Sequence, residues 1–115
     1  MIRYIENKTR IAELTSYQAI TLADAISRLV NEAKGKVIQC HFGRYLSDFF
    51  MEGRYSYVKV SGSELRFHDS KEVNNRMVLP LKEVVKVEKG EDAKYNFITF
   101  RFDLKDNMFV TITPM

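Results

Sequence analysis

The sequence is poor in the residues that build covalent or metal-bound sites. Among its 115 residues there is one cysteine, Cys40, and there are two histidines, His41 and His68. A lone thiol cannot form an intramolecular disulfide, and this predicts a reducing compartment, the cytoplasm. Because these residues show no spacing typical of a metal centre, we expect neither a metal nor any other cofactor.

Motifs for catalysis are missing as well. A nucleophile needs a base beside it, but Cys40 and His41 are strand neighbours and should point to opposite faces. The Gly62-Ser63 step lacks the pattern of a nucleophile elbow, and five scattered glycines form no phosphate-cradling loop. We therefore expect a non-catalytic protein, with a small enzyme of unrecognised type as an alternative.

Long apolar runs are absent too. No stretch reaches the roughly 18 apolar residues of a membrane-spanning helix, and no apolar leader follows Arg3. Hydrophobic residues make up 45% of the chain and charged residues 29%, which is typical of a globular protein. A chain of this length and composition predicts a single domain over residues 1–115.

The charge balance points to no particular partner. There are 18 basic and 15 acidic residues, for a net charge of +3. Acids accompany most basic residues, as where Glu88 lies between Lys86 and Lys89. This favours a mixed, solvated surface. A basic patch for nucleic acid or anionic lipid is the alternative, because such partners are bound by clustered cations.

One helix is indicated after Thr21. Thr21 is a suitable N-cap, and Asp24 follows three residues later, an arrangement similar to a capping box. Gly35 suits the left-handed residue that ends a helix. In between, five apolar residues recur at helical spacing and predict one buried face: Leu22, Ile26, Leu29, Val30 and Ala33.

After Gly35 the apolar period changes to two, which is typical of strands. Residues 61–63, 90–92 and 105–107 are expected to be turns. Residues 2–5 are a candidate strand, and 11–17 a loop or weak helical turn. The main expected strands cover residues 37–42, 55–60, 64–68, 77–79, 85–87, 96–104 and 108–113.

These elements predict an α+β protein. Successive strands with short connections favour antiparallel pairing. We expect about seven strands in a curved, mostly antiparallel sheet or small barrel, with the amphipathic N-terminal helix packed against it.

A candidate binding surface lies around the strand at 55–60. Tyr55, Tyr57 and Lys59 alternate along it, and stacked aromatic rings with cations are typical of single-stranded nucleic-acid binding. Cross-strand packing of the tyrosines is the alternative interpretation. The candidate residues are Arg54, Tyr55, Tyr57, Lys59, Arg66 and His68.

The most apolar connecting stretch is 45–51. Its residues favour either a buried strand or short helix, or an exposed lip that contacts a partner. Tyr45, Phe49 and Phe50 are the candidate contact residues for the second case.

Residues 55–112 resemble PH-like and GRAM-like domains. The resemblance rests on 58–60, 65–68, 98–100 and, above all, the Leu79-Pro80-Leu81 step within 78–87. It implies a barrel that binds lipid headgroups or peptides, and it transfers no headgroup-binding residue. The family closes with a C-terminal helix, whereas this chain ends on a predicted strand.

The sequence thus predicts a non-catalytic binding module that contacts another protein or a second copy of itself. A nucleic-acid or anionic-lipid binder is the alternative, favoured if the cations cluster on one face.

Overall fold

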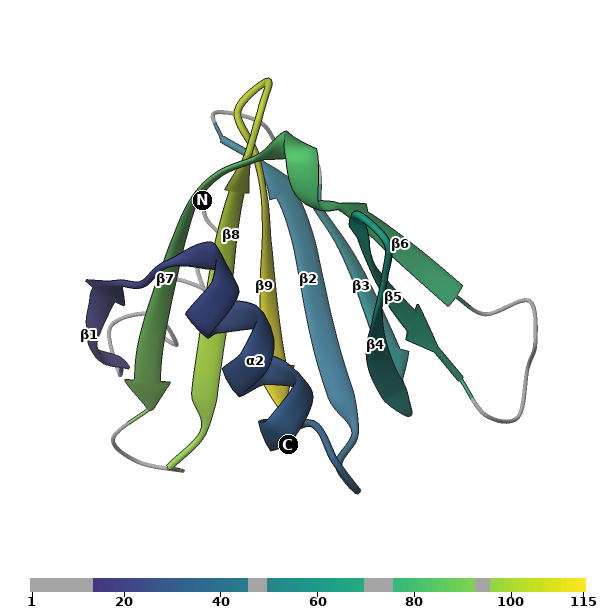
Figure 1. Cartoon of the computed structure of the whole chain (residues 1–115). Coiled ribbons are helices and arrows are strands. Elements are labelled where there is room, and N and C mark those ends of the chain that lie inside the picture. The colour runs from purple at the N-terminus through teal and green to yellow at the C-terminus, as the bar shows by residue number, and fades with distance from the viewer. Residues whose placement is uncertain (1–13, 46–49, 70–75, 93–95) are drawn as a thin grey trace.

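The computed structural model describes residues 14–45, 50–69, 76–92 and 96–115 (Figure 1). These ranges contain one α-helix, α2 (Leu22–Glu32), and one 3-10 helix, η1 (Leu81–Glu83). The predicted α+β class with antiparallel pairing is confirmed. The strands are β1 (Leu14–Ala19), β2 (Ile38–Arg44), β3 (Phe50–Tyr55), β4 (Tyr57–Ser61), β5 (Glu64–His68), β6 (Arg76–Pro80), β7 (Val84–Asp92), β8 (Ile98–Leu104) and β9 (Met108–Pro114).

The strands form two sheets. The large sheet has the order β1-β7-β8-β9-β2-β3, and the small sheet has the order β4-β5-β6. The chain passes from one sheet to the other at Ser56, between β3 and β4, and again through η1, between β6 and β7. Such corners let two sheets enclose one core. Helix α2 lies in front of the large sheet, beside the small one (Figure 1).

The helix begins as the sequence predicts. The backbone N–H of Asp24 donates to Thr21 Oγ1 at 3.1 Å, which satisfies one of the free donors of the first turn. Leu29 is fully buried, while Ile26 is partly buried against the core. Gly35 follows the helix with a φ of +72°, the left-handed conformation that glycine adopts at little cost.

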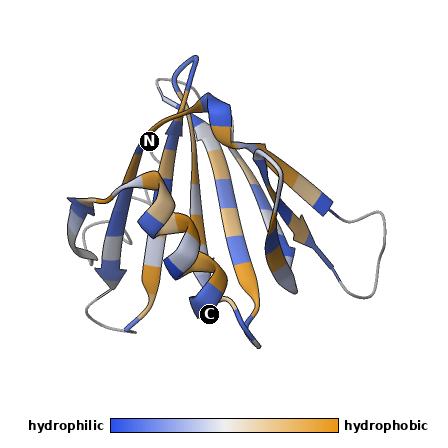
Figure 2. Cartoon of the chain, viewed as in Figure 1, coloured by the Kyte–Doolittle hydropathy of each residue, from blue (hydrophilic) through white to orange (hydrophobic). Residues whose placement is uncertain are grey.

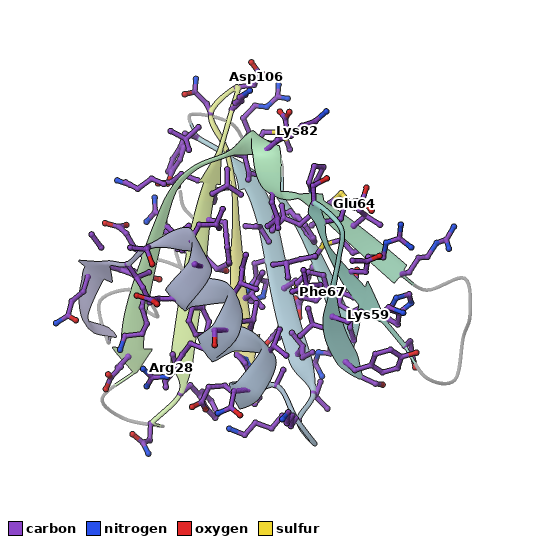
Figure 3. All side chains as sticks on the ribbon, viewed as in Figure 1. Arg28, Lys59, Glu64, Phe67, Lys82 and Asp106 are labelled. Carbon is purple, nitrogen blue, oxygen red and sulfur yellow. The ribbon has the colours of Figure 1, made fainter. Side chains whose placement is uncertain are left out.

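The core lies between the sheets and under the helix. Inward and outward residues alternate along the strands, and Figure 2 shows the matching change of hydropathy along β2. Phe67 of the small sheet lies in this interior (Figure 3). The fully buried large side chains come from both sheets and the helix: Phe67, Phe100, Phe102, Leu29, Ile38, Leu65, Ile112, Val110 and Cys40.

The predicted single sheet or barrel of about seven strands is wrong in two places. Residues 14–17, expected as a loop or weak helical turn, belong to β1, which pairs with the edge of β7. The predicted strand at 55–60 is bent at Ser56, so its first residue ends β3 and the rest form β4. Both differences arise from pairing between distant segments, which local alternation does not report.

The predicted turn at 90–92 is also wrong. Gly90 continues β7 and lies between Tyr17 of β1 and Thr99 of β8. The turns at 61–63 and 105–107 are confirmed, with Gly62 at a φ of +60°. The candidate strand at 2–5 and residues 46–49 of the apolar stretch lie outside the described residues. In the described part of the chain, no helix has both the length and the apolar character needed to cross a membrane.

Candidate functional site

The outer face of the small sheet gathers side chains that are far apart in the sequence. His68 lies directly opposite Tyr57 on one side and opposite Arg76 on the other. Cross-strand partners share a face, and alternation with the buried Leu65 and Phe67 turns this face outward. The neighbouring row adds two cations, and together these residues form what we call the basic face: Tyr57, Lys59, Arg66, His68 and Arg76.

Positive charge on the basic face is poorly neutralised. Arg66 donates to Glu64 Oε1 through Nε at 3.1 Å and through Nη2 at 3.0 Å. Lys59 and Arg76 form no ion pair with any residue in the described ranges. Among the residues that the structure describes, the face therefore carries three cations and, beside them, the acid Glu64 (Lys59 and Glu64 are labelled in Figure 3). A cluster of one sign raises the local concentration of anions far more than the small net charge of the chain suggests.

An aromatic ring lies beside these cations. Tyr57 stacks on the His68 imidazole with ring centroids 5.2 Å apart and an interplanar angle of 23°. Tyr57 is 46% exposed on β4, which is an edge strand of the small sheet. An exposed aromatic ring whose orientation is fixed by stacking on a neighbour can stack on a further planar group, such as a base.

A hollow of about 270 Å³ lies along β5 and β6. His68 is one of the residues that line it, and its Nε2 is buried with no hydrogen-bond partner among the residues that the structure describes. A buried polar nitrogen without a partner costs about 1–3 kcal/mol, unless a ligand or water supplies one. The lining residues are Arg66, His68, Arg76, Met77 and Val78.

Two of the six predicted surface residues lie elsewhere. Tyr55 is 8% exposed, and its ring contacts Phe67 in the core with centroids 5.8 Å apart. Arg54 lies on the large sheet, where Nε is 3.7 Å from Glu52 Oε2. The bend at Ser56, whose N–H donates to the His68 carbonyl at 2.7 Å, separates both residues from Tyr57.

Sequence reasoning missed Arg76. Arg76 precedes the apolar residues from which the strand at 77–79 was predicted, so the alternation did not show which face of the sheet carries its side chain. The register with β5 supplies the missing information, because it places Arg76 opposite His68.

The outer face of the large sheet also centres on an arginine. The guanidinium carbon of Arg101 lies 5.2 Å from the ring centroid of Tyr45, 5.6 Å from that of Phe109 and 5.8 Å from that of Tyr17. We call Arg101 and these three rings the arginine cluster. Burial raises the pKa of the Tyr17 phenol, and the nearby positive charge of Arg101 opposes that effect.

Charges around the arginine cluster are matched within the molecule. Asp103 Oδ1 accepts from the Tyr45 hydroxyl at 2.8 Å and lies 3.4 Å from Arg101 Nε. Lys86 Nζ is 3.7 Å from the other oxygen of Asp103 and 3.9 Å from Glu88. This arrangement holds four strands and the turn after β2 together.

The candidate apolar contact is only partly described. Tyr45 is 36% exposed, and its ring packs on Phe109 with centroids 4.7 Å apart. Phe49 lies outside the described residues, and Phe50 is placed at the start of β3 by its backbone alone. Tyr45 therefore has contacts of its own within the fold.

The remaining reactive residues lie on opposite sides of β2. Cys40 is fully buried, and burial raises the pKa of its thiol far above the usual range. His41 points outward, with Nε2 3.6 Å from Glu52 Oε1. Over the described residues, no group of three His, Cys, Asp or Glu side chains could hold a metal ion.

Comparisons with known proteins add no functional residues. No family model, no curated protein and no solved structure matches this chain. The assignment of function therefore depends on the geometry of the basic face.

Proposed function

We propose that the protein is a non-catalytic module that binds single-stranded nucleic acid on the basic face. The observation that carries the proposal is the gathering of Lys59, Arg66 and Arg76 around the exposed ring of Tyr57. The sequence alone favoured a protein partner, because its charges look balanced along the chain. Because the cations cluster on one sheet, we now place nucleic acid before a protein partner.

Each part of the basic face suits one part of a polynucleotide strand. Lysine and arginine neutralise backbone phosphates and release the bound counterions. A tyrosine ring stacks on any base, because every base has an aromatic face, and the base must be unpaired to be reached. An anionic membrane would favour apolar side chains that enter the lipid. Among the described residues, this face exposes one aliphatic side chain, Val78, at 41%.

Fluorescence anisotropy with a labelled single strand of about 12 nucleotides, within the usual range of site sizes, tests the proposal. We expect micromolar binding at low salt. If two or three phosphates are neutralised, log K should fall with log salt at a slope of about −1.4 to −2.1. No binding at low salt would contradict the proposal.

Substitutions locate the binding surface. Tyr57→Ala should weaken binding by roughly 1–3 kcal/mol, the contribution of one stacked base. Arg54→Gln is the matched control, because Arg54 is close in sequence but lies on the large sheet, paired with Glu52. We expect no more than a twofold change for this control. Equal effects of the two substitutions would mean that the strand does not use the basic face.

Two rivals are separated by the same assay. Polyglutamate that binds as tightly as the oligonucleotide and ignores Tyr57→Ala would favour an acidic protein partner. Tight binding to vesicles containing anionic lipid would favour the function that the resemblance to PH-like and GRAM-like domains implies. Both stay predictions, and nothing in the basic face supports them as directly as the exposed ring beside three cations.

A further inference from the structure

The hollow on the basic face is positioned for more than a backbone phosphate. It lies where the row of Tyr57, His68 and Arg76 meets Arg66. Backbone phosphates along a strand are diesters with one negative charge each. A phosphate monoester carries a charge of about −1.5 to −2 at neutral pH and has three strongly accepting oxygens.

We propose that the hollow binds a phosphate monoester at one end of the bound strand. This inference rests on the proposed function and names the part of the strand that the hollow recognises. Arg66 and Arg76 supply planar guanidinium groups, which pair well with phosphate oxygens. His68 lines the same hollow, and its Nε2 lacks a partner among the described residues.

The placement of charge supports a ligand of this kind. Arg66 is held by Glu64, which orients its guanidinium through Nε and Nη2. Arg76 has no acid within ion-pair distance in the described ranges. A phosphate monoester offers three accepting oxygens to the two guanidinium groups, whereas a diester within a strand offers only its two unesterified oxygens.

The aromatic stack supports an end rather than a passing strand. Tyr57 stacks on the His68 ring, and Tyr57 itself is exposed on the edge strand of the small sheet. A terminal base can stack on Tyr57 while its own phosphate enters the hollow beside His68. The terminal nucleotide would thus be read by adjacent groups: the ring by Tyr57, and the phosphate by Arg66, His68 and Arg76.

The test compares three strands of identical sequence in the anisotropy assay: one with hydroxyls at both ends, one with a 5′-phosphate and one with a 3′-phosphate. We expect one phosphorylated strand to bind about tenfold more tightly than the hydroxyl strand. The added phosphate accepts charge-assisted hydrogen bonds from the arginines, and these are stronger than hydrogen bonds between neutral groups. The preferred end shows which terminus enters the hollow.

Variants assign the preference to the hollow. Arg76→Gln and His68→Gln should each reduce the preference to within about twofold, while the hydroxyl strand still binds. Lys59→Gln is the control, because Lys59 does not line the hollow. It should weaken all three strands by the same factor and leave their ratio unchanged. Thermal melting shows that each variant is folded, and Arg76→Gln alone decides the matter if His68→Gln does not fold.

Each outcome has a distinct meaning. Equal affinity for all three strands overturns the monoester site and leaves the proposed function standing. Failure of every strand to bind overturns both. A preference that survives Arg76→Gln places the phosphate elsewhere and also overturns this inference.

Discussion

The two outer faces of the molecule are built from similar residues and differ in how their charges are matched. On the large sheet, Arg101 lies among three aromatic rings and beside Asp103. On the small sheet, Arg66 and Arg76 lie near an aromatic stack, with Glu64 as the acid of that face. The cations of the large sheet's outer face are paired with acids of the same face, while the cations of the basic face outnumber the acids that the structure describes there.

This difference separates a structural arginine from a binding one. An arginine that stacks on rings and bonds a carboxylate stabilises the strands that supply those groups. An arginine without such partners adds little to stability and remains able to pair with an anion. Residue type alone does not distinguish them, because both faces combine arginine with tyrosine.

Both faces rest on one core, so breaking that core should affect them together. Leu29→Ala should lower the free energy of unfolding by about 2–5 kcal/mol, since Leu29 is fully buried in the core cluster that both sheets share with the helix. Urea denaturation measures the loss. Ser27→Ala is the control, because Ser27 is exposed on the same helix, and it should change the free energy of unfolding by no more than about 0.5 kcal/mol. Separate unfolding transitions for the two sheets, or a loss below 0.5 kcal/mol, would contradict a shared core.

Alkaline pH should weaken the core through Cys40 and Tyr55. Burial raises the pKa of Cys40, and it also raises that of Tyr55, with Cys40 as a further cause. The folded state therefore keeps its thiol protonated while the unfolded chain ionises above about pH 9. Stability is retained below that pH and falls above it.

The expected loss from Cys40 is about 2 kcal/mol between pH 9 and pH 11, because the slope reaches 1.36 kcal/mol per pH unit only where the thiol of the unfolded chain is fully ionised. Urea titrations of the parent protein and of Cys40→Ala measure it. The variant should lose less stability than the parent over this interval, by about that amount. An identical pH dependence for both proteins would show that the thiol is accessible to ionisation in the folded state.

The next prediction sharpens the contrast between the two arginines. Arg101→Ala should cost about 1–2 kcal/mol of stability, because it removes the cation from three rings and a partner from Asp103. Arg76→Ala, the matched change on the basic face, should cost less than about 0.5 kcal/mol. Thermal and urea unfolding compare the two variants, and equal costs would mean that Arg101 stabilises the fold no more than Arg76 does.

The smallest expected effect on stability belongs to the basic face as a whole. The double substitution Lys59→Gln with Arg76→Gln should change the free energy of unfolding by less than about 0.5 kcal/mol. The same double substitution should abolish micromolar oligonucleotide binding. A large loss of stability would mean that these cations stabilise the fold and are not available to bind a ligand.

Local patterns predicted the elements that depend on local physics. The cap at Thr21, the buried position of Leu29 and the left-handed Gly35 follow from capping, apolar period and the lack of a Cβ. The hairpin of β4 and β5 follows from alternation on both sides of a glycine turn. Predictions failed where pairing with a distant strand decides the outcome, as for β1 and for residues 90–92 of β7.

The candidate site shows the same division. Tyr57, Lys59, Arg66 and His68 could be placed together from the predicted hairpin, because alternation and a short turn fix their register. Arg54 and Tyr55 could not be separated from them, because the bend at Ser56 leaves no mark in the alternation of the sequence.

By itself, therefore, the sequence determined the helix after Thr21 and the strands whose apolar residues alternate, since both patterns depend on neighbours a few residues away. The tertiary structure decided which charges meet. Arg101 meets Asp103 and three rings, while Arg76 joins His68 and Arg66 with no acid of its own in the described ranges. Strand order and register set these encounters, and both arise from packing between segments that the chain keeps far apart.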